Sequence, residues 1–447
     1  MFKKILIANR GEIALRVVRT CRDLGIKTVA VHSVIDSDSM HVRLADESVC
    51  IGESSIKQSY LNPAPIIAAA EITNADAIHP GAGFLSENPD FASMVVNHKM
   101  KFIGPTSKQI EMFGDKLLSK KLIKKNGLRT IPGSEGYLEN IEEAKKIAKN
   151  IGYPVILKAG SGGGGKGIRV IKNEKKLISN YLIVKQEVQN SFGNQNIYLE
   201  KFFENPKHIE IQIVADKKGK VVHLGERDCS IQRNRQKIIE ETPSPILSDK
   251  ERNYICNLVV KTIKKIGYES LGTVEMLYEK GKFYFMEMNA RVQIEHTITE
   301  RVTGIDLIKQ QIKIAAGQNI KFNQKDIKNS GHSIQCRINA EDPLTFIPSP
   351  GRIREYHAPG GPGVRVDSAL YAGCIIPHQY DNLISKVIIY SRNRNEAILR
   401  LKRCLIEYVI NGIKTNIPLH LKILNNKDYI SGKCHINWLE HFLSIQN

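Results

Sequence analysis

The sequence lacks the features that would place the chain in a membrane, in a disulfide framework or around a zinc ion. No apolar run approaches the ~20 residues that a membrane-spanning helix requires. The eight cysteines are scattered and never form a C-x-x-C pair. The basic N-terminus carries too short an apolar run for a signal peptide. These absences favour a globular, cytoplasmic protein, and 447 residues suffice for two or three domains.

The positive charge is large but is not concentrated in any one segment. There are 65 Lys and Arg residues against 46 Asp and Glu, a formal net charge of +19. Such a balance is compatible with nucleic-acid binding. The lysines are nevertheless spread along the chain with little aromatic interleaving, so an anionic nucleotide or an acidic partner protein explains them equally well. A basic RNA- or DNA-associated protein stays an alternative, but neither nucleic acid nor membrane is an expected partner.

Short apolar strands alternate with helical patterns over residues 1–114. Strands are predicted at Lys4–Ala8, Thr28–His32, Ser48–Ile51, Ala77–His79 and Lys101–Ile103, with helices at Glu12–Leu24 and Pro65–Glu71. This alternation predicts a parallel, doubly wound α/β domain of the Rossmann-like kind. The loop from His79 to Phe84 follows a strand end, where such sheets usually place ligand contacts, although ordinary turn chemistry also explains its glycines.

Four consecutive glycines stand between two strands predicted at Tyr153–Ala159 and Ile168–Ile171. The stretch is similar to a P-loop, but Gly167 replaces the Ser or Thr after the lysine, and a strand follows in place of a helix. This arrangement predicts a mobile flap whose backbone N–H groups approach phosphates closely. A flexible hairpin tip is the alternative.

The segment Thr273–His296 contains the clearest pattern of a site. Apolar side chains occupy even positions, and the odd positions carry Glu287, Asn289, Arg291, Gln293 and Glu295. An extended chain would place these five polar groups on one face. The preceding segment Gly272–Tyr278 predicts a β-hairpin that brings Glu275 within reach of Glu287. The two share a face only if the connection has an odd number of residues or the pair contains a bulge, and Gly281 could supply the left-handed position required.

Two carboxylates and the amide oxygen of Asn289 suit a hard cation such as Mg²⁺, which also takes oxygens from phosphates. Arg291 can hold a planar, carboxylate-like anion bidentately, and Glu295 is a candidate general base. With Lys158 and Lys166 flanking the glycines, these groups predict nucleotide binding and phosphoryl transfer to an oxyanion. Taken alone, the pattern also suits a half-buried strand with a wetted face.

Six motifs carry a resemblance to a known family: IANRGEIALR, HPGAGFLSENPDF, the glycine flap, ERDCSIQRNRQK, FMEMNARVQIEH and CRINAEDP. On these the chain closely resembles biotin carboxylase, the ATP-grasp subunit of bacterial acetyl-CoA carboxylase, over essentially its whole length. The resemblance implies a Rossmann-like domain at 1–114, an ATP-grasp domain at 115–330 with a mobile lid at about 131–203, and a C-terminal mixed α/β domain at 331–447.

The implied reaction forms carboxyphosphate from ATP and bicarbonate and transfers CO₂ to N1′ of biotin on a biotin carboxyl carrier protein. This is the first half-reaction of acetyl-CoA carboxylase, which supplies malonyl-CoA for fatty acid synthesis. By resemblance the ATP contacts are Lys116, Lys158, Gly164, Gly165, His208, Gln232, Glu275 and Glu287, with Glu200, Lys201, Phe202 and Phe203 against the adenine. Two Mg²⁺ (or Mn²⁺) ions would be held by Glu275, Glu287 and Asn289.

The resemblance also implies the bicarbonate and biotin contacts. Lys237, Arg291 and the backbone N–H of Ile294 would hold bicarbonate, and Glu295 would deprotonate it. Arg337 would stabilise the enolate-like biotin; without the resemblance, an ordinary surface or ion-pair arginine is an equally good interpretation. The nearest rival is another ATP-grasp ligase, such as a carbamoyl-phosphate or purine-pathway enzyme.

The chain departs from the family pattern at Ala82, Lys166, Arg235, Thr297 and Pro362, where Tyr, Arg, His, Pro and Phe are common. Pro362 lies at the expected dimer interface, where Arg19 and Arg365 are retained, so a homodimer is expected. No Ala-Met-Lys-Met biotinylation site is present. The carrier protein and the carboxyltransferase α and β subunits are therefore expected to be separate polypeptides.

Overall fold

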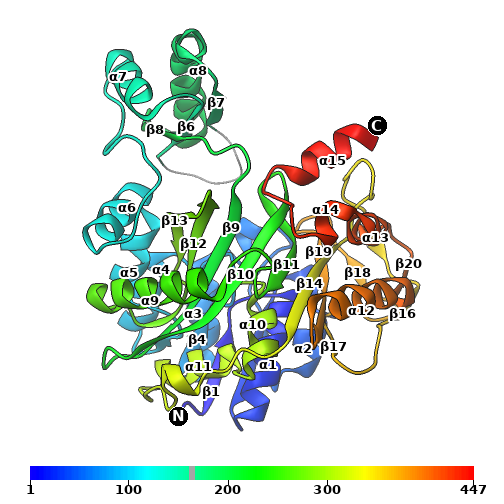
Figure 1. The fold of residues 1–447 in the computed structure, drawn as a ribbon. Helices are drawn as coiled ribbons and strands as arrows, with labels where there is room; N and C mark the ends of the chain where they lie inside the picture. The colour runs from blue at the N-terminus through cyan, green and yellow to red at the C-terminus, as the bar shows by residue number, and fades with distance from the viewer. Residues whose placement is uncertain (161–166, 447) are drawn as a thin grey trace.

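The structure is a computed structural model that describes residues 1–160 and 167–446. Gly164, Gly165 and Lys166 of the predicted flap thus lie outside the described residues. Figure 1 shows a broad body of sheets and helices, with a smaller unit that stands apart from it at the top of the view. Among the described residues, no helix combines the length and the apolar character needed to cross a bilayer.

Five parallel strands form the N-terminal sheet in the order β3-β2-β1-β4-β5. Ile5 and Ile7 of the central strand pack with α1 on one face, and Leu6 packs with α3 and α4 on the other. Helices therefore cover both faces, and the predicted doubly wound, Rossmann-like fold is confirmed. The elements are β1 (Lys4–Ile7), α1 (Gly11–Asp23), β2 (Lys27–His32), α2 (Met40–Leu44), β3 (Glu47–Cys50), α3 (Pro63–Ile72), β4 (Ala77–His79), α4 (Pro89–Asn97), β5 (Lys101–Phe102) and α5 (Ser107–Gly114).

An eight-stranded antiparallel sheet, ordered β13-β12-β9-β10-β11-β14-β19-β17, forms the centre of the molecule. It continues across residue 331, because β11 pairs with β14. The ATP-grasp and C-terminal regions therefore share one sheet. The strands are β9 (Lys207–Ala215), β10 (Val221–Arg233), β11 (Gln236–Thr242), β12 (Ser270–Glu279), β13 (Lys282–Asn289), β14 (His332–Asn339), β17 (Val364–Ser368) and β19 (Leu383–Ser391). Associated helices are α6 (Lys116–Lys125), α9 (Asp249–Ile266), α10 (His296–Thr303) and α11 (Leu307–Ala315).

The unit that stands apart in Figure 1 has a hydrophobic core of its own, from Leu138 to Leu199. It is a three-stranded sheet, ordered β7-β6-β8, with two helices. Its elements are α7 (Ile141–Ile151), β6 (Val155–Ala159), β7 (Ile168–Ile171), α8 (Glu174–Phe192) and β8 (Ile197–Lys201). We call this unit the lid. The sequence pattern predicted no helix at α8, although Asn173 caps its start and the left-handed Gly193 ends it.

The C-terminal region packs helices α12 and α13 against one face of the shared sheet. Its further elements are β15 (Gly351–Arg352), β16 (Glu355–His357), β18 (Ile375–Ile376), α12 (Arg394–Glu407), β20 (Val409–Asn411), α13 (Ile417–Asn425), α14 (Lys427–Ile430) and α15 (Trp438–Gln446). The last helix reaches back toward the β10–β11 turn, where the Asn234 amide donates to Glu440 at 3.3 Å. The predicted mixed α/β character is confirmed.

The predicted hairpin forms, but its second strand is shorter than the alternating pattern indicates. Lys280 and Gly281 are left-handed, with φ of 49° and 77°, and make a two-residue turn. A bulge after Glu275 places that residue opposite Glu287, as one of the two predicted arrangements requires. The strand then ends at Asn289, so the prediction of one extended face through Glu295 is wrong.

Candidate active site

One ammonium group lies among three carboxylates on the central sheet. Lys237 Nζ of β11 donates to Glu210 at 2.5 Å, to Glu275 at 2.8 Å and to Glu295 at 2.7 Å. Burial on its own would lower the pKa of Lys237, but the carboxylates raise it well above its usual range. Lys237 therefore stays charged and links β11 to β9, to β12 and to the loop that precedes α10. We call these four residues the sheet cluster.

Glu295 is held between two cations. Its second oxygen accepts from Arg337 Nη2 at 3.0 Å, while Arg337 Nε donates to Glu240 at 2.5 Å. Burial favours the neutral form of Glu295, but Lys237 and Arg337 outweigh it and hold the pKa well below its usual range. Glu295 is thus an ionised carboxylate that joins the lysine to the arginine.

The loop after β13 gathers the remaining polar side chains without an extended backbone. Arg291 donates to Asn289 Oδ1 and to Gln293 Oε1, both at 2.9 Å. From the N-terminal domain, Glu87 accepts the Arg291 Nε–H at 2.8 Å and the Ala290 N–H at 2.9 Å. The five groups predicted to share one strand face are therefore brought near one another by a loop that Glu87 clamps.

The predicted metal ligands lie together at the end of the hairpin. Asn289 Nδ2 and Gln293 Nε2 each donate to Glu275 at 2.9 Å. Burial and the neighbouring charge of Glu275 raise the pKa of Glu287. A divalent cation between the two carboxylates would relieve that repulsion, so these residues fit a hard metal ion. Glu287 and Asn289 also line a cavity of about 220 Å³ together with Lys116 at the start of α6.

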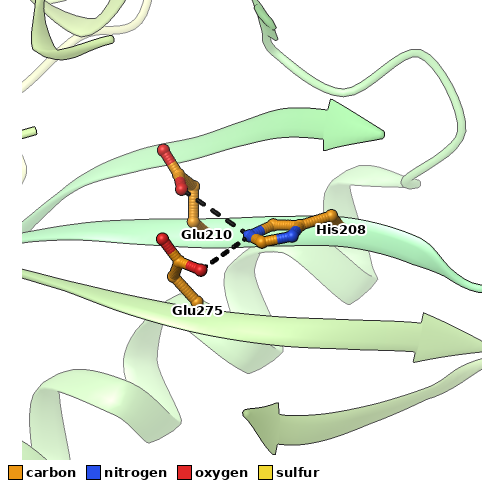
Figure 2. A group of neighbouring side chains, drawn as sticks. All are labelled: His208, Glu210 and Glu275. Atoms are coloured by element: carbon orange, nitrogen blue, oxygen red, sulfur yellow. Dashed lines mark ion pairs between the residues drawn. The ribbon is translucent and has the colours of Figure 1, made fainter. Parts of the chain in front are cut away.

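Figure 2 shows His208 with its Nε2 facing Glu210 and Glu275, at 3.8 Å and 3.1 Å. These three residues form a group with the spacing of metal ligands. The Lys237 ammonium already binds both carboxylates, so the positive charge that a metal would supply comes from a lysine. The other imidazole nitrogen, Nδ1, lies 2.9 Å from Gln232 Nε2, which joins two predicted ATP contacts.

Where the lid joins the body, the charges are arranged in the opposite way to the sheet cluster: one carboxylate lies between two ammonium groups. Glu200 of β8 accepts from Lys158 of β6 at 2.6 Å and from Lys120 of α6. Burial on its own would raise the pKa of Glu200, but the two lysines lower it. Phe203 lies against Tyr284, with ring centroids 4.7 Å apart. We call Glu200, Lys120 and Lys158 the hinge cluster.

Several predicted residues lie apart from these clusters. Lys201 donates to the lid carbonyls of Gly152 and Tyr153 at 3.0 and 3.1 Å and does not join Glu200. The Ile294 carbonyl accepts from the buried Lys386 at 3.0 Å. Phe202 is only half-buried, and Arg235 is exposed at the tip of the β10–β11 hairpin.

Sequence reasoning missed the residues that hold the site together: Glu87, Lys120, Glu210, Arg227 and Glu240. Arg227 is fully buried and donates to Glu210 at 2.5 Å. The alternating segment His208–Val214 carried a usable signal, because Glu210 shares a strand face with His208. The other partners lie on a distant loop, a helix and two strands, and they have no local signature.

The comparisons with known proteins cover the whole chain. Residues 1–110 match the model described as biotin carboxylase, N-terminal domain, and residues 335–441 the biotin carboxylase C-terminal domain. Residues 115–323 match the ATP binding domain of the carbamoyl-phosphate synthase L chain. Biotin carboxylase of Haemophilus influenzae is 52% identical over 446 residues, which cover 100% of both chains. The chain belongs to the biotin carboxylase family.

Two further relatives of the chain come from other carboxylases. A pyruvate carboxylase subunit of Methanothermobacter thermautotrophicus is 50% identical over 443 residues, 99% of this chain and 90% of the relative. The biotin carboxylase domain dimer of Hydrogenobacter thermophilus 2-oxoglutarate carboxylase, solved with MgADP, ADP and bicarbonate, has a TM-score of 0.96 at 49% identity. It covers 100% of this chain and 99% of that one. The predicted family, its ATP-grasp fold and its ligase class are confirmed.

Proposed function

We propose that the chain carboxylates biotin on a biotin carboxyl carrier protein, with ATP and bicarbonate, as the first half-reaction of acetyl-CoA carboxylase. The observation that carries this proposal is the position of Glu295. Its carboxylate bridges Lys237, the expected bicarbonate ligand, and Arg337, the expected biotin ligand. A base at this position can take the proton of bicarbonate and still lie beside the biotin ligand.

The surroundings of Glu295 suggest how its basicity is controlled. While Lys237 and Arg337 both bind it, its pKa is too low for an effective base. Bicarbonate bound by Lys237 and Arg291 would draw the ammonium away from Glu295, which then accepts the bicarbonate proton more readily. The carbonate oxygen then attacks the γ-phosphorus of ATP, which releases ADP and gives carboxyphosphate. Cleavage of its C–O bond releases CO₂ and phosphate. N1′ of biotin then gives its proton to that phosphate and attacks the CO₂ beside Arg337.

Other side chains of this chain would hold the nucleotide and its metal. Glu275, Glu287 and Asn289 would hold Mg²⁺ or Mn²⁺, which when bound neutralises charge on the phosphates. Lys116 and Lys158 would contact the phosphates, and the Glu200–Phe203 segment would lie against the adenine. His208 and Gln232, already in contact with each other, would complete this side of the site.

The test is ATP hydrolysis by the purified protein with Mg²⁺ and bicarbonate, with and without free biotin. We expect hydrolysis to require bicarbonate, to rise with biotin and to fall about 10²–10⁴-fold in Glu295→Gln, the range of general base catalysis. Glu111→Gln, an exposed carboxylate on α5, is the matched control. Hydrolysis that ignores bicarbonate and biotin would favour another ATP-grasp ligase.

The final acceptor and the assembly are separate parts of the proposal. A 2-oxo acid carboxylase is the second candidate, because the Methanothermobacter pyruvate carboxylase subunit is 50% identical to this chain. Adding purified carrier protein with carboxyltransferase α and β subunits should give malonyl-CoA from acetyl-CoA and no product from pyruvate or 2-oxoglutarate. We also propose a homodimer through the face of Arg19 and Pro362, which light scattering would test against a monomer.

A further inference from the structure

A chain of hydrogen bonds connects the start of α10 to the guanidinium of Arg337. The Thr297 hydroxyl donates to Gln335 Oε1, and Gln335 Nε2 donates to Glu240 at 3.0 Å. Glu240 in turn accepts from Arg337 Nε at 2.5 Å. Gln335 and Glu240 are directly opposite on the paired strands β14 and β11, so their side chains meet without a change of backbone.

Each bond in this chain fixes the next because every member is buried. Thr297, Gln335 and Glu240 are all 0% exposed. A carboxylate only accepts hydrogen bonds, so Glu240 requires the NH₂ end of the Gln335 amide. The amide oxygen must then face Thr297, where it accepts the hydroxyl proton. This order of donors and acceptors fixes the rotamer of Glu240. The position of Glu240 in turn orients the Arg337 guanidinium, whose Nε–H it accepts.

The backbone at residue 297 does not by itself require threonine. Thr297 is the second residue of α10, within the first turn, where a backbone N–H has no partner inside the helix. Proline, which is common at this position in the family, therefore also suits the backbone. The property that distinguishes Thr297 here is its hydroxyl group.

We infer that Thr297 is a positioning residue of this enzyme, which orients Arg337 for the biotin half of the reaction through Gln335 and Glu240. The inference rests on the proposed function, because Arg337 is taken as the biotin ligand. Glu295 is affected less, since Lys237 holds its other oxygen at 2.7 Å independently of this chain of bonds. The bicarbonate half of the reaction should therefore be largely independent of Thr297.

The test uses Thr297→Val, which keeps the shape and removes the donor, beside Thr297→Ser, which keeps the hydroxyl. In Thr297→Val we expect kcat for free-biotin carboxylation to fall about five- to tenfold, as for one lost buried hydrogen bond. Bicarbonate-dependent ATP hydrolysis without biotin should change less than about twofold on the same scale. Thr297→Ser should restore most of the biotin rate. Gln335→Met, which removes the central amide, should reproduce the Thr297→Val pattern.

Three outcomes would overturn the inference. Equal losses of both activities in Thr297→Val, with a lower melting temperature, would make Thr297 a structural residue only. An unchanged biotin rate would show that the hydroxyl does not orient Arg337. A Thr297→Ser variant as slow as Thr297→Val would exclude the donor as the cause. Failure of the proposed function is distinct, since the unmodified enzyme would then show no stimulation by biotin.

Discussion

The sheet cluster and the hinge cluster are opposite solutions for a buried charge. In the sheet cluster one ammonium, Lys237, serves three carboxylates. In the hinge cluster one carboxylate, Glu200, serves two ammonium groups. Loss of Lys237 leaves three anions without their shared cation, whereas loss of one hinge lysine leaves Glu200 with the other. Glu200 can therefore lose the ammonium of Lys158 and keep that of Lys120, whereas the three carboxylates of the sheet cluster have no second ammonium among them.

The largest effect is expected from Lys237→Met, which breaks the sheet cluster. Three buried carboxylates then share no ammonium, and removal of one partner of a buried ion pair costs about 3–5 kcal/mol. We expect that loss in the free energy of unfolding, measured with urea, together with loss of bicarbonate-dependent ATP hydrolysis. Mn²⁺ should recover part of the stability, since His208, Glu210 and Glu275 then lack the lysine between them.

The control for this variant is Lys282→Met, at the exposed start of β13. Its unfolding free energy and activity should stay close to those of the unmodified protein. A Lys237→Met protein as stable as Lys282→Met would mean that the three carboxylates do not depend on the ammonium, and the comparison of the two clusters would fail.

A third ion cluster lies on the face of β11 that points away from the site. A substitution there should change the stability of the protein without changing its catalytic rate. Glu241 accepts from Arg394 at 2.6 and 3.0 Å and from His332 at 2.8 Å. Burial alone would raise the pKa of Glu241, but His332 and Arg394 lower it from 4.5 to about 2. The depressed pKa stabilises the folded state by about 3 kcal/mol above pH 4.5, and this contribution disappears as the pH falls toward 2.

Glu241→Gln should therefore unfold more easily than the unmodified protein at pH 7, by about that amount. The difference should shrink steadily in urea titrations between pH 5 and pH 3. The neighbouring Glu240 faces the site and Glu241 does not, so kcat at pH 7 should be retained while the protein is folded. A stability difference that does not depend on pH would contradict the assignment to the carboxylate charge.

Lys158→Gln tests the hinge cluster. The buried Glu200 keeps Lys120, and the Lys158 side chain is itself 21% exposed, so the free energy of unfolding should change by less than about 1 kcal/mol. The KM for ATP should rise about 10- to 100-fold, because one cation for the phosphates is lost. The matched control is Lys149→Gln, at an exposed position of helix α7 in the lid. Equal KM values in the two variants would contradict a phosphate contact by Lys158.

The sequence pattern predicted those parts of the structure that are determined by residues close to one another in the chain. The period of two and Gly281 were sufficient to predict the hairpin and the Glu275–Glu287 pair, with the observed bulge as one of two possible arrangements. The same period wrongly extended β13 to Glu295, because the strand ends where Glu87 takes the Ala290 N–H from 203 positions away. The alternation of apolar and polar residues in one segment gives no information about a partner so far away in the chain.

The rest of the site depends on register between distant strands. Lys237 and Arg337 meet Glu295 only because β11 and β14 are neighbours in the shared sheet. Helix α8 is a different kind of miss, because its Asn173 cap and Gly193 end were visible in the sequence. The family resemblance supplied the residue assignments, but it named none of the supporting residues Glu87, Glu210 or Glu240.

The smallest effect is expected at Arg235, where the hairpin β10–β11 turns. Asn234 and Arg235 are left-handed, with φ of 48° and 65°, and form the two-residue turn. The Arg235 side chain is exposed, so its charge is screened by water and salt and acts weakly on either cluster. Histidine tolerates left-handed backbone better than most residues, so Arg235→His should fold normally. The KM for ATP should change less than about threefold, within the range of an exposed charge pair. A change as large as that of Lys158→Gln would place the turn against the nucleotide and add Arg235 to the proposed phosphate contacts Lys116 and Lys158.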